Sequence, residues 1–255
     1  MLQDTQVRLL VGSLVVSLIA ALLYSFTRSR KLVSKGSAVL LTGPSEGGKT
    51  AIHSALIFNQ MLPSHTSMQA NISIMSLSSS ERKHRSVKLI DLPGHPRLRD
   101  HFNEHLNDAK AVAFVVDATT IARNGAAVAD SLPPSQQPPS LVILAHKYDL
   151  IESSGTPNFE LAVSRVRTIL ERELDKRRTS QAAGVGVGQL GDDETTGTEM
   201  GGLECIGPAG VGFKFKDWEG GEIEILGTSV SEKGDSEKSL DGLDKFKQWL
   251  EDLSW

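Results

Sequence analysis

Apolar and polar residues alternate along most of the chain with two different periods. Short apolar runs rich in valine, isoleucine and leucine predict strands, and apolar residues that recur every three or four positions predict helices. The predicted strands are residues 38–41, 72–77, 87–92, 111–118, 141–145 and 222–227. The predicted helices are residues 49–61, 96–108, 122–131, 158–177 and 239–253. This alternation predicts an α/β fold with a mainly parallel six-stranded sheet and helices on both faces.

A long uncharged apolar run over residues 9–26 precedes the alternating part of the chain. At 1.5 Å per residue it covers about 27 Å of a hydrocarbon core that is roughly 30 Å thick. The alternatives are a cleaved signal peptide and a buried core helix. A basic cluster follows the run, and no small-residue cleavage site is evident, so we predict one transmembrane helix. The cluster consists of Arg28, Arg30, Lys31 and Lys35.

These basic residues also predict the orientation of the chain, because basic residues favour the cytosolic side of a membrane. We expect residues 1–8 to be lumenal, residues 27–36 to form a basic linker and residues 37–255 to form a cytosolic domain. Within that domain, residues 178–212 are dense in glycine, threonine, serine and acid and lack apolar periodicity. This composition predicts a disordered insertion. The proline-rich residues 131–140 are interpreted as a surface connection, with a polyproline ligand as the alternative.

A phosphate-binding motif lies between the first predicted strand of the domain and the helix after it. Residues 43–50 read Gly-Pro-Ser-Glu-Gly-Gly-Lys-Thr, which matches G-x-x-x-x-G-K-[ST]. In this motif the backbone N–H groups surround phosphate oxygens, the lysine reaches the β- and γ-phosphates, and the hydroxyl ligates Mg²⁺. The predicted nucleotide contacts in this segment are Gly43, Pro44, Ser45, Glu46, Gly47, Gly48, Lys49, Thr50 and Ala51.

Two further segments supply the expected metal and γ-phosphate contacts. Asp91 and Gly94 form a D-x-x-G pattern directly after a predicted strand, where the acid can hold Mg²⁺ and the glycine N–H can meet the γ-phosphate. The loop between the first helix and second strand of the domain offers Thr66 or Ser67 as a hydroxyl that senses the metal, and we prefer Thr66. The predicted metal ligands are therefore Thr50, Thr66 and Asp91.

Residues 146–149 read His-Lys-Tyr-Asp, close to the guanine-reading pattern [NT]-K-x-D. Asp149 can accept hydrogen bonds from N1 and the N2 amino group of guanine, a donor pair that adenine lacks. The stem of Lys147 can lie over the base, and His146 completes the element. After the last predicted strand, Thr228 and Ser229 are placed to offer backbone N–H groups to the guanine O6.

Together, these motifs predict a P-loop small-GTPase fold and resemble the beta-subunit family of the signal recognition particle receptor. Members are Arf-like small GTPases with an N-terminal transmembrane helix. The resemblance covers the apolar run, the three motifs and residues 227–253. It implies a GTPase domain on the cytosolic face of the endoplasmic reticulum membrane that binds GTP or GDP with Mg²⁺. It also implies that the chain anchors the receptor's alpha subunit for co-translational protein targeting, with the ribosome and the translocon as further candidate partners.

Several residues of the motifs differ from those usual in small GTPases. His146 replaces the usual asparagine or threonine, and His95 stands where many small GTPases carry the glutamine that positions water. Ser45 and Glu46 add bulk and charge near the phosphates. We therefore expect slow or partner-stimulated hydrolysis, with His95 as the candidate water-positioning residue. The alternatives are a non-hydrolysing structural anchor and an Arf-like trafficking GTPase, which would carry a myristoylated or amphipathic N-terminus.

Composition narrows the remaining possibilities. The net charge is −4 with both signs mixed, so no basic surface for direct binding of nucleic acid is expected. Cys205 is the single cysteine, which excludes an intramolecular disulfide. His101, Glu104 and His105 match an inverted zinc-protease pattern, which we interpret as an exposed helix face. Asn71 begins a glycosylation-type pattern that we interpret as the start of a strand.

Overall fold

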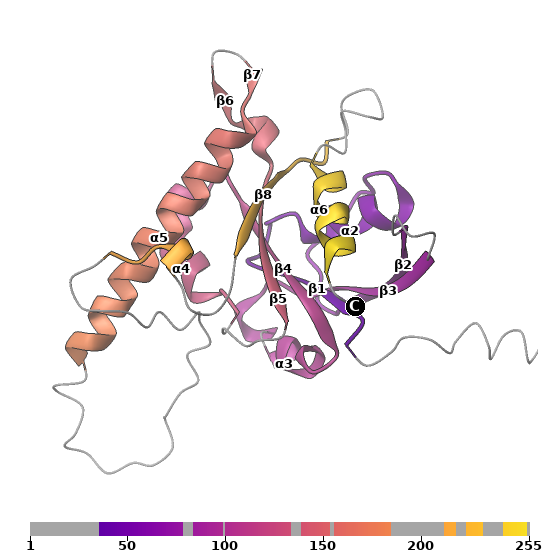
Figure 1. Ribbon diagram of the computed structural model, residues 1–255, viewed down its shortest axis with the longest axis horizontal. Helices are drawn as coiled ribbons and strands as arrows, with labels where there is room; N and C mark the ends of the chain where they lie inside the picture. Colours follow the sequence, from indigo (N-terminus) through magenta and orange to yellow (C-terminus); the bar gives the residue numbers. More distant parts are fainter. Residues whose placement is uncertain are drawn as a thin grey trace, which may run out of the picture. The chain divides into compact units, whose positions relative to one another are not determined.

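Six strands form one mixed sheet in the order β2-β3-β1-β4-β5-β8 (Figure 1). The strands are β1 (Ala38–Thr42), β2 (Asn71–Ser78), β3 (His84–Asp91), β4 (Ala109–Asp117), β5 (Ser140–His146) and β8 (Glu224–Thr228). Strand β2 runs antiparallel to β3, and every other neighbouring pair is parallel. The predicted six-stranded, mainly parallel sheet is therefore confirmed.

The computed structural model describes residues 36–78, 84–98, 100–133, 139–153, 156–184, 212–217, 223–231 and 242–253. Its helices are α2 (Lys49–Phe58), α3 (Asp100–Leu106), α4 (Ile121–Asp130), α5 (Phe159–Gly184) and α6 (Leu243–Asp252). Short 3₁₀ helices are η1 (Pro96–Leu98), η2 (Tyr148–Leu150) and η3 (Phe215–Asp217). A two-stranded hairpin that was not predicted, β6 (Glu152–Ser153) with β7 (Thr156–Pro157), lies between η2 and α5.

Apolar side chains bury both faces of the sheet, as the alternation of strand and helix predicts. Helices α2 and α6 pack on one face, where Phe246 of α6 is fully buried among side chains of β1, β4 and β5. Helices α4 and α5 pack on the other face around Phe114, and α3 covers the same face near β1. Because both faces are covered, the polar side chains of the candidate site gather at the strand ends.

Several element bounds differ from the prediction. The predicted helix over residues 96–108 is divided into η1 and α3. Helix α2 ends at Phe58 because Asn59 adopts a left-handed backbone, with φ of 55°. Helix α5 continues to Gly184, so the first residues of the predicted disordered insertion 178–212 are helical instead. The hydroxyls of Thr179 and Ser180 each donate to the carbonyl four residues earlier in this last part of the helix.

The predicted membrane span lies outside the described residues. Those residues contain no helix that is both long and apolar enough to cross a membrane. Residues 1–35, which include the predicted span over 9–26 and most of the basic linker, are not among them, and neither is Cys205. The transmembrane helix and the orientation of the chain therefore stay predictions.

Candidate functional site

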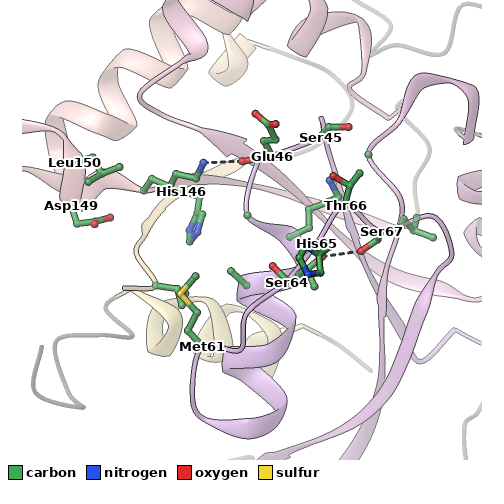
Figure 2. A pocket seen from close by; sticks show the side chains of 18 residues that line it. Ser45, Glu46, Met61, Ser64, His65, Thr66, Ser67, His146, Asp149 and Leu150 are labelled. Atoms are coloured by element: carbon green, nitrogen blue, oxygen red, sulfur yellow. Dashed lines mark hydrogen bonds between the residues drawn. The ribbon is translucent and has the colours of Figure 1, made fainter. Parts of the chain in front are cut away.

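A cavity of about 510 Å³ opens where β1, β3 and β5 end (Figure 2). This is the usual place for a ligand in an open parallel sheet. The predicted site residues that line it are Ser45, Glu46, Gly48, Lys49, Thr50, Ala51, Thr66, Gly94, His146, Lys147 and Asp149. The predicted residues that do not line it are Gly43, Pro44, Gly47, Asp91, His95, Thr228 and Ser229. In Figure 2, His146, Asp149 and Leu150 lie on one side of the cavity, and Ser64 to Ser67 lie on the other.

The phosphate-binding loop connects β1 to α2 through residues with left-handed backbone. Gly43 has φ of 131°, and a Cβ there would overlap the carbonyl oxygen of Val115 in β4. Gly48 has φ of 96° and caps the N-terminus of α2. Glu46, at φ of 63°, adopts the same region despite its side chain. A loop bent in this way points backbone N–H groups inward at a helix N-terminus, where anions are stabilised.

Lys49 closes this loop from the inside. Its Nζ donates to the carbonyl oxygens of Gly43 at 3.0 Å and Pro44 at 2.8 Å. Burial lowers the pKa of Lys49 to about 8, an effect that the nearby Asp91 carboxylate partly offsets. An amino group that is buried and only partly compensated favours an additional negative charge, such as a phosphate, beside it.

A group of oxygen atoms lies beside Lys49, where the metal is expected. The Thr50 hydroxyl donates to Asp91 Oδ2 at 2.8 Å and lies 3.2 Å from the Ser67 hydroxyl. The Asn71 amide donates to the same Asp91 oxygen at 3.1 Å. Asp91 is fully buried, and its Oδ1 has no hydrogen-bond partner among the described residues. Because Mg²⁺ prefers carboxylate and hydroxyl oxygens, an ion here would satisfy that unpaired oxygen.

The structure places Ser67, rather than the preferred Thr66, next to Thr50. Thr66 lines the cavity, but its side chain is exposed, whereas the Ser67 hydroxyl makes the contact with Thr50. Figure 2 labels both Thr66 and Ser67 and draws the hydrogen bond to Ser67. A one-residue shift along an irregular loop changes which side chain points inward, and sequence spacing alone does not determine it.

His146 joins three parts of the site. Its Nδ1 lies 3.1 Å from the Thr228 hydroxyl at the end of β8, and both side chains are buried. The other edge of the ring lies against Gly48, where a Cβ would overlap the Cδ2 and Nε2 atoms of the imidazole. The imidazole therefore connects the guanine-type loop, the phosphate-binding loop and the last strand. Its bulk fits because position 48 is a glycine.

The charge state of His146 follows from this burial. Burial and the neighbouring Lys147 lower the pKa of His146 to about 4, although Asp149 and Asp117 act in the opposite direction. The ring is therefore neutral near pH 7, with one nitrogen that donates and one that accepts a hydrogen bond. A neutral side chain that has both a donor and an acceptor can replace the amide usually found at this position.

Lys147 forms a second link across the cavity. Its Nζ donates to the Glu46 carbonyl oxygen at 2.8 Å and to Asp117 Oδ2 at 2.7 Å. The other oxygen of Asp117 accepts from the backbone N–H and hydroxyl of Thr119 at 2.8 and 2.6 Å. Burial favours a higher pKa for Asp117, but the hydrogen bonds from Lys147 and Thr119 outweigh it and lower the pKa. The lysine stem is thereby fixed along one wall of the cavity.

Sequence reasoning did not identify Asp117 as a site residue. A signal was present, because Asp117 is an acid at the end of a buried apolar strand, β4, in the same relation as Asp91 to β3. Val230 was also missed, and it lines the cavity beyond Thr228 and Ser229. Those two residues are buried, and the Thr228 side chain contacts His146.

Gly94 and His95 lie in the turn that follows Asp91, and of the two only Gly94 lines the cavity. A Cβ on Gly94 would lie 2.5 Å from Lys49 Nζ and 2.6 Å from the backbone N of Ser45, so only glycine fits against the phosphate-binding loop. His95 is exposed and does not line the cavity. Its Nδ1 accepts a hydrogen bond from the backbone N–H of Arg97 at 3.2 Å. The predicted water-positioning residue therefore lies outside the cavity in this structure.

The zinc-type pattern on α3 forms an exposed contact. His101 Nδ1 lies 3.3 Å from Glu104 Oε2, and His101 is partly and Glu104 largely exposed. Across the part of the chain that the structure describes, no group of three or more histidine, cysteine, aspartate or glutamate side chains could hold a metal ion.

The chain has a small-GTPase-like fold. Three features define it: the order of the strands in the sheet, the phosphate-binding loop, and the side-chain contacts that join the end of β5 to the ends of β4 and β8. The family model of the signal recognition particle receptor beta subunit matches residues 34–220. The chain is 30% identical to the human signal recognition particle receptor subunit beta, over 71% of this chain and 67% of that protein. It is 26% identical to the corresponding Dictyostelium discoideum protein, over 87% and 73% of the two chains. The chain belongs to the signal recognition particle receptor beta-subunit family.

Solved structures agree on the fold. A structure of the mammalian signal recognition particle receptor matches with a TM-score of 0.61 and 24% identity, over 85% of this chain and all of that one. The SRb-GTP/SRX complex of the receptor from Chaetomium thermophilum matches with a TM-score of 0.58 and 20% identity, over the same shares. At these identities the comparison establishes the fold.

The low pKa of His146 predicts a specific dependence of stability on pH. In the unfolded chain the imidazole takes up a proton near pH 6.5, whereas in the folded chain it does so only near pH 4. Folding stability is therefore lost as the pH falls through this window, by about 3 kcal/mol from this residue. His146→Asn removes this titration, so the wild-type chain should lose about 3 kcal/mol more than the variant between pH 7 and pH 4.

Chemical denaturation of both proteins in detergent at several pH values measures this difference. Titrating groups that do not interact with His146 are common to the two proteins and cancel in the comparison. Equal losses of unfolding free energy would show that His146 is not buried in neutral form.

Proposed function

We propose that the chain is a guanine-nucleotide-binding subunit that holds GTP or GDP with Mg²⁺ and recruits the receptor's alpha subunit to the endoplasmic reticulum membrane. This proposal rests on two contacts that join the guanine-type loop to the phosphate-binding loop. His146 packs on Gly48 and meets Thr228, and Lys147 reaches the Glu46 carbonyl. A site whose base-reading and phosphate-binding loops support each other is suited to binding a whole nucleotide rather than a phosphate group alone.

The choice of base is assigned to Asp149. It lies in η2 and lines the cavity next to Leu150, on the side away from the metal group. An ionised carboxylate accepts two hydrogen bonds from the guanine edge, and such charge-assisted bonds are about twice as strong as neutral ones. The stem of Lys147, held at its tip, offers an apolar surface to one face of the base.

The metal would be held by Thr50 and Asp91, with Ser67 or Thr66 from the loop before β2. Thr50 and Asp91 are already in contact, and the unpaired Oδ1 of Asp91 is the best-supported ligand atom. When bound, Mg²⁺ would neutralise charge on the β- and γ-phosphates. The loop N–H groups and Lys49 would orient the phosphates, and the Gly94 N–H is the expected contact to the γ-phosphate, since Gly94 lies against Lys49 and the phosphate-binding loop.

Recruitment of the alpha subunit and the membrane location rest on the family and on the predicted span. The Chaetomium thermophilum neighbour is a complex of SRb-GTP with SRX, which supports a GTP-bound form that engages a partner. The apolar run over residues 9–26, which is predicted to span the membrane, would supply the anchor, and the GTPase domain would then lie on the cytosolic side. The ribosome and the translocon remain candidate partners by resemblance.

A non-hydrolysing anchor is the second candidate function, and the position of His95 favours it. The imidazole lies outside the cavity and accepts a hydrogen bond from the backbone of η1, so it would have to move to orient water at a nucleotide bound in the cavity. Nucleotide would then act as a lasting part of the partner interface.

The other alternative is an Arf-like trafficking GTPase. An ADP-ribosylation factor D from Dictyostelium discoideum also matches, at 25% identity over 60% of this chain, but the receptor family matches better.

Replacement of Asp149 tests the choice of base. Asp149→Asn should lower GTP affinity by about 100-fold, because the carboxylate loses two charge-assisted hydrogen bonds. The same variant should gain affinity for xanthine nucleotides, which present an acceptor where guanine presents an amino group. Fluorescent-nucleotide titration measures both, with Glu152→Gln on the exposed hairpin as a matched control. Unchanged GTP affinity in Asp149→Asn would remove the assignment.

Partner capture tests the recruitment step. The full chain in detergent, loaded with GTP, should retain purified receptor alpha subunit on an affinity resin, and GDP loading should reduce the retained amount severalfold. Lys49→Ala should abolish the difference, because Lys49 supports the phosphates from inside the loop. Equal retention with GTP, with GDP and without nucleotide would contradict nucleotide-dependent recruitment.

Single-turnover cleavage of GTP separates the two candidate functions. A regulated switch should cleave bound GTP slowly alone and faster when the alpha subunit and ribosomes are added. Absence of cleavage under every condition, together with tight GTP binding, would favour the non-hydrolysing anchor. His95→Ala should slow any stimulated cleavage if a partner turns this side chain inward.

A further inference from the structure

Asn71 lies beside the metal group although it belongs to none of the nucleotide motifs. It is the first residue of β2, and the antiparallel register pairs it directly with Asp91, the last residue of β3. Directly opposed residues of such a pair have Cβ atoms about 4.5–5.5 Å apart on one face of the sheet. The Asn71 amide uses this closeness to donate to Asp91 Oδ2 at 3.1 Å.

The hydrogen bond from Asn71 determines how the buried carboxylate is oriented. Asp91 Oδ2 accepts from both Asn71 and Thr50, whereas Oδ1 is buried with no hydrogen-bond partner among the described residues. A partial rotation of the carboxylate would break both hydrogen bonds, whereas a half-turn would only exchange two equivalent oxygens. The pair of donors therefore fixes the plane of the carboxylate, with one oxygen toward Thr50 and Asn71 and the other without a donor among the described residues.

We propose that Asn71 is a positioning residue that orients Asp91 for Mg²⁺ and thereby links the metal site to the edge strand β2. The inference rests on the proposed function, because it requires nucleotide and metal to bind in this cavity. The amide is suited to this role since it donates a hydrogen bond without adding charge next to a buried carboxylate. Residues that orient metal ligands typically contribute 10–100-fold to metal affinity.

The link extends to the surface of the molecule through β2. This strand is at the edge of the sheet and continues from the loop that carries Ser67. The side chains of Ile72 and Ile74, next along the strand, are 52% and 60% exposed. A change at the Asp91 carboxylate on metal binding would therefore act directly on the first residue of an edge strand that carries two exposed isoleucines.

The test measures how Mg²⁺ slows release of a fluorescent GDP from the full chain in detergent. Asn71→Ala should raise the Mg²⁺ concentration for half-maximal slowing by about tenfold. Its release rate in excess chelator should stay within about twofold of wild type, because the nucleotide contacts themselves are intact. Ser73→Ala is the matched control, since Ser73 lies two residues along the same strand and pairs with Leu89 rather than Asp91.

A second variant gives an independent readout. Asn71→Asp removes the amide that donates to Asp91 and places a second carboxylate there, so like-charge repulsion replaces the hydrogen bond. Release should then be fastest in chelator and should return to the wild-type rate at saturating Mg²⁺, which neutralises the pair.

Two outcomes would overturn the inference. One is a wild-type Mg²⁺ midpoint in both Asn71 variants, and the other is faster release by the same factor at every Mg²⁺ concentration, as a structural defect would give. A wild-type chain that fails to bind GDP at all would instead overturn the proposed function, and this inference with it.

Discussion

The candidate site depends on one buried contact, the packing of the His146 ring between Gly48 and Thr228. Gly48 caps the N-terminus of α2, His146 ends β5 and Thr228 ends β8, so the contact joins three segments far apart in the sequence. It can form only because position 48 has no side chain and because the ring is neutral in its buried position. The same contact fixes the distance between the loop for phosphates and the loop for the base, which is what a nucleotide site requires.

Much of the fold could be predicted from the sequence, because buried parallel strands read as apolar runs and the motifs occur at their ends. The end of α5 could not be predicted, because the residues after Arg177 have no apolar periodicity. Local hydrogen bonds of Thr179 and Ser180 support this part of the helix instead. The contacts of Lys147 with Asp117 were also missed. They depend on how the ends of β4 and β5 meet, and motif spacing does not contain that information.

Binding is better supported than hydrolysis by the arrangement of the site. Lys49, Thr50, Asp91, His146 and Lys147 interact with one another or with the phosphate-binding loop, so the groups that would hold a nucleotide are largely preorganised. The only group expected to position water, His95, is exposed and does not line the cavity. A chain with these properties is suited to hold a nucleotide for long periods and to respond when a partner rearranges the D-x-x-G turn.

The most direct test is the identity of the nucleotide that the chain carries when it is purified from membranes with Mg²⁺ present. The account predicts close to one GTP or GDP per chain, released on denaturation and identified by chromatography, with the amount lowered strongly in Lys49→Ala. Recovery of adenine nucleotide, or of no nucleotide from a chain that also fails to take up GTP and GDP, would contradict it.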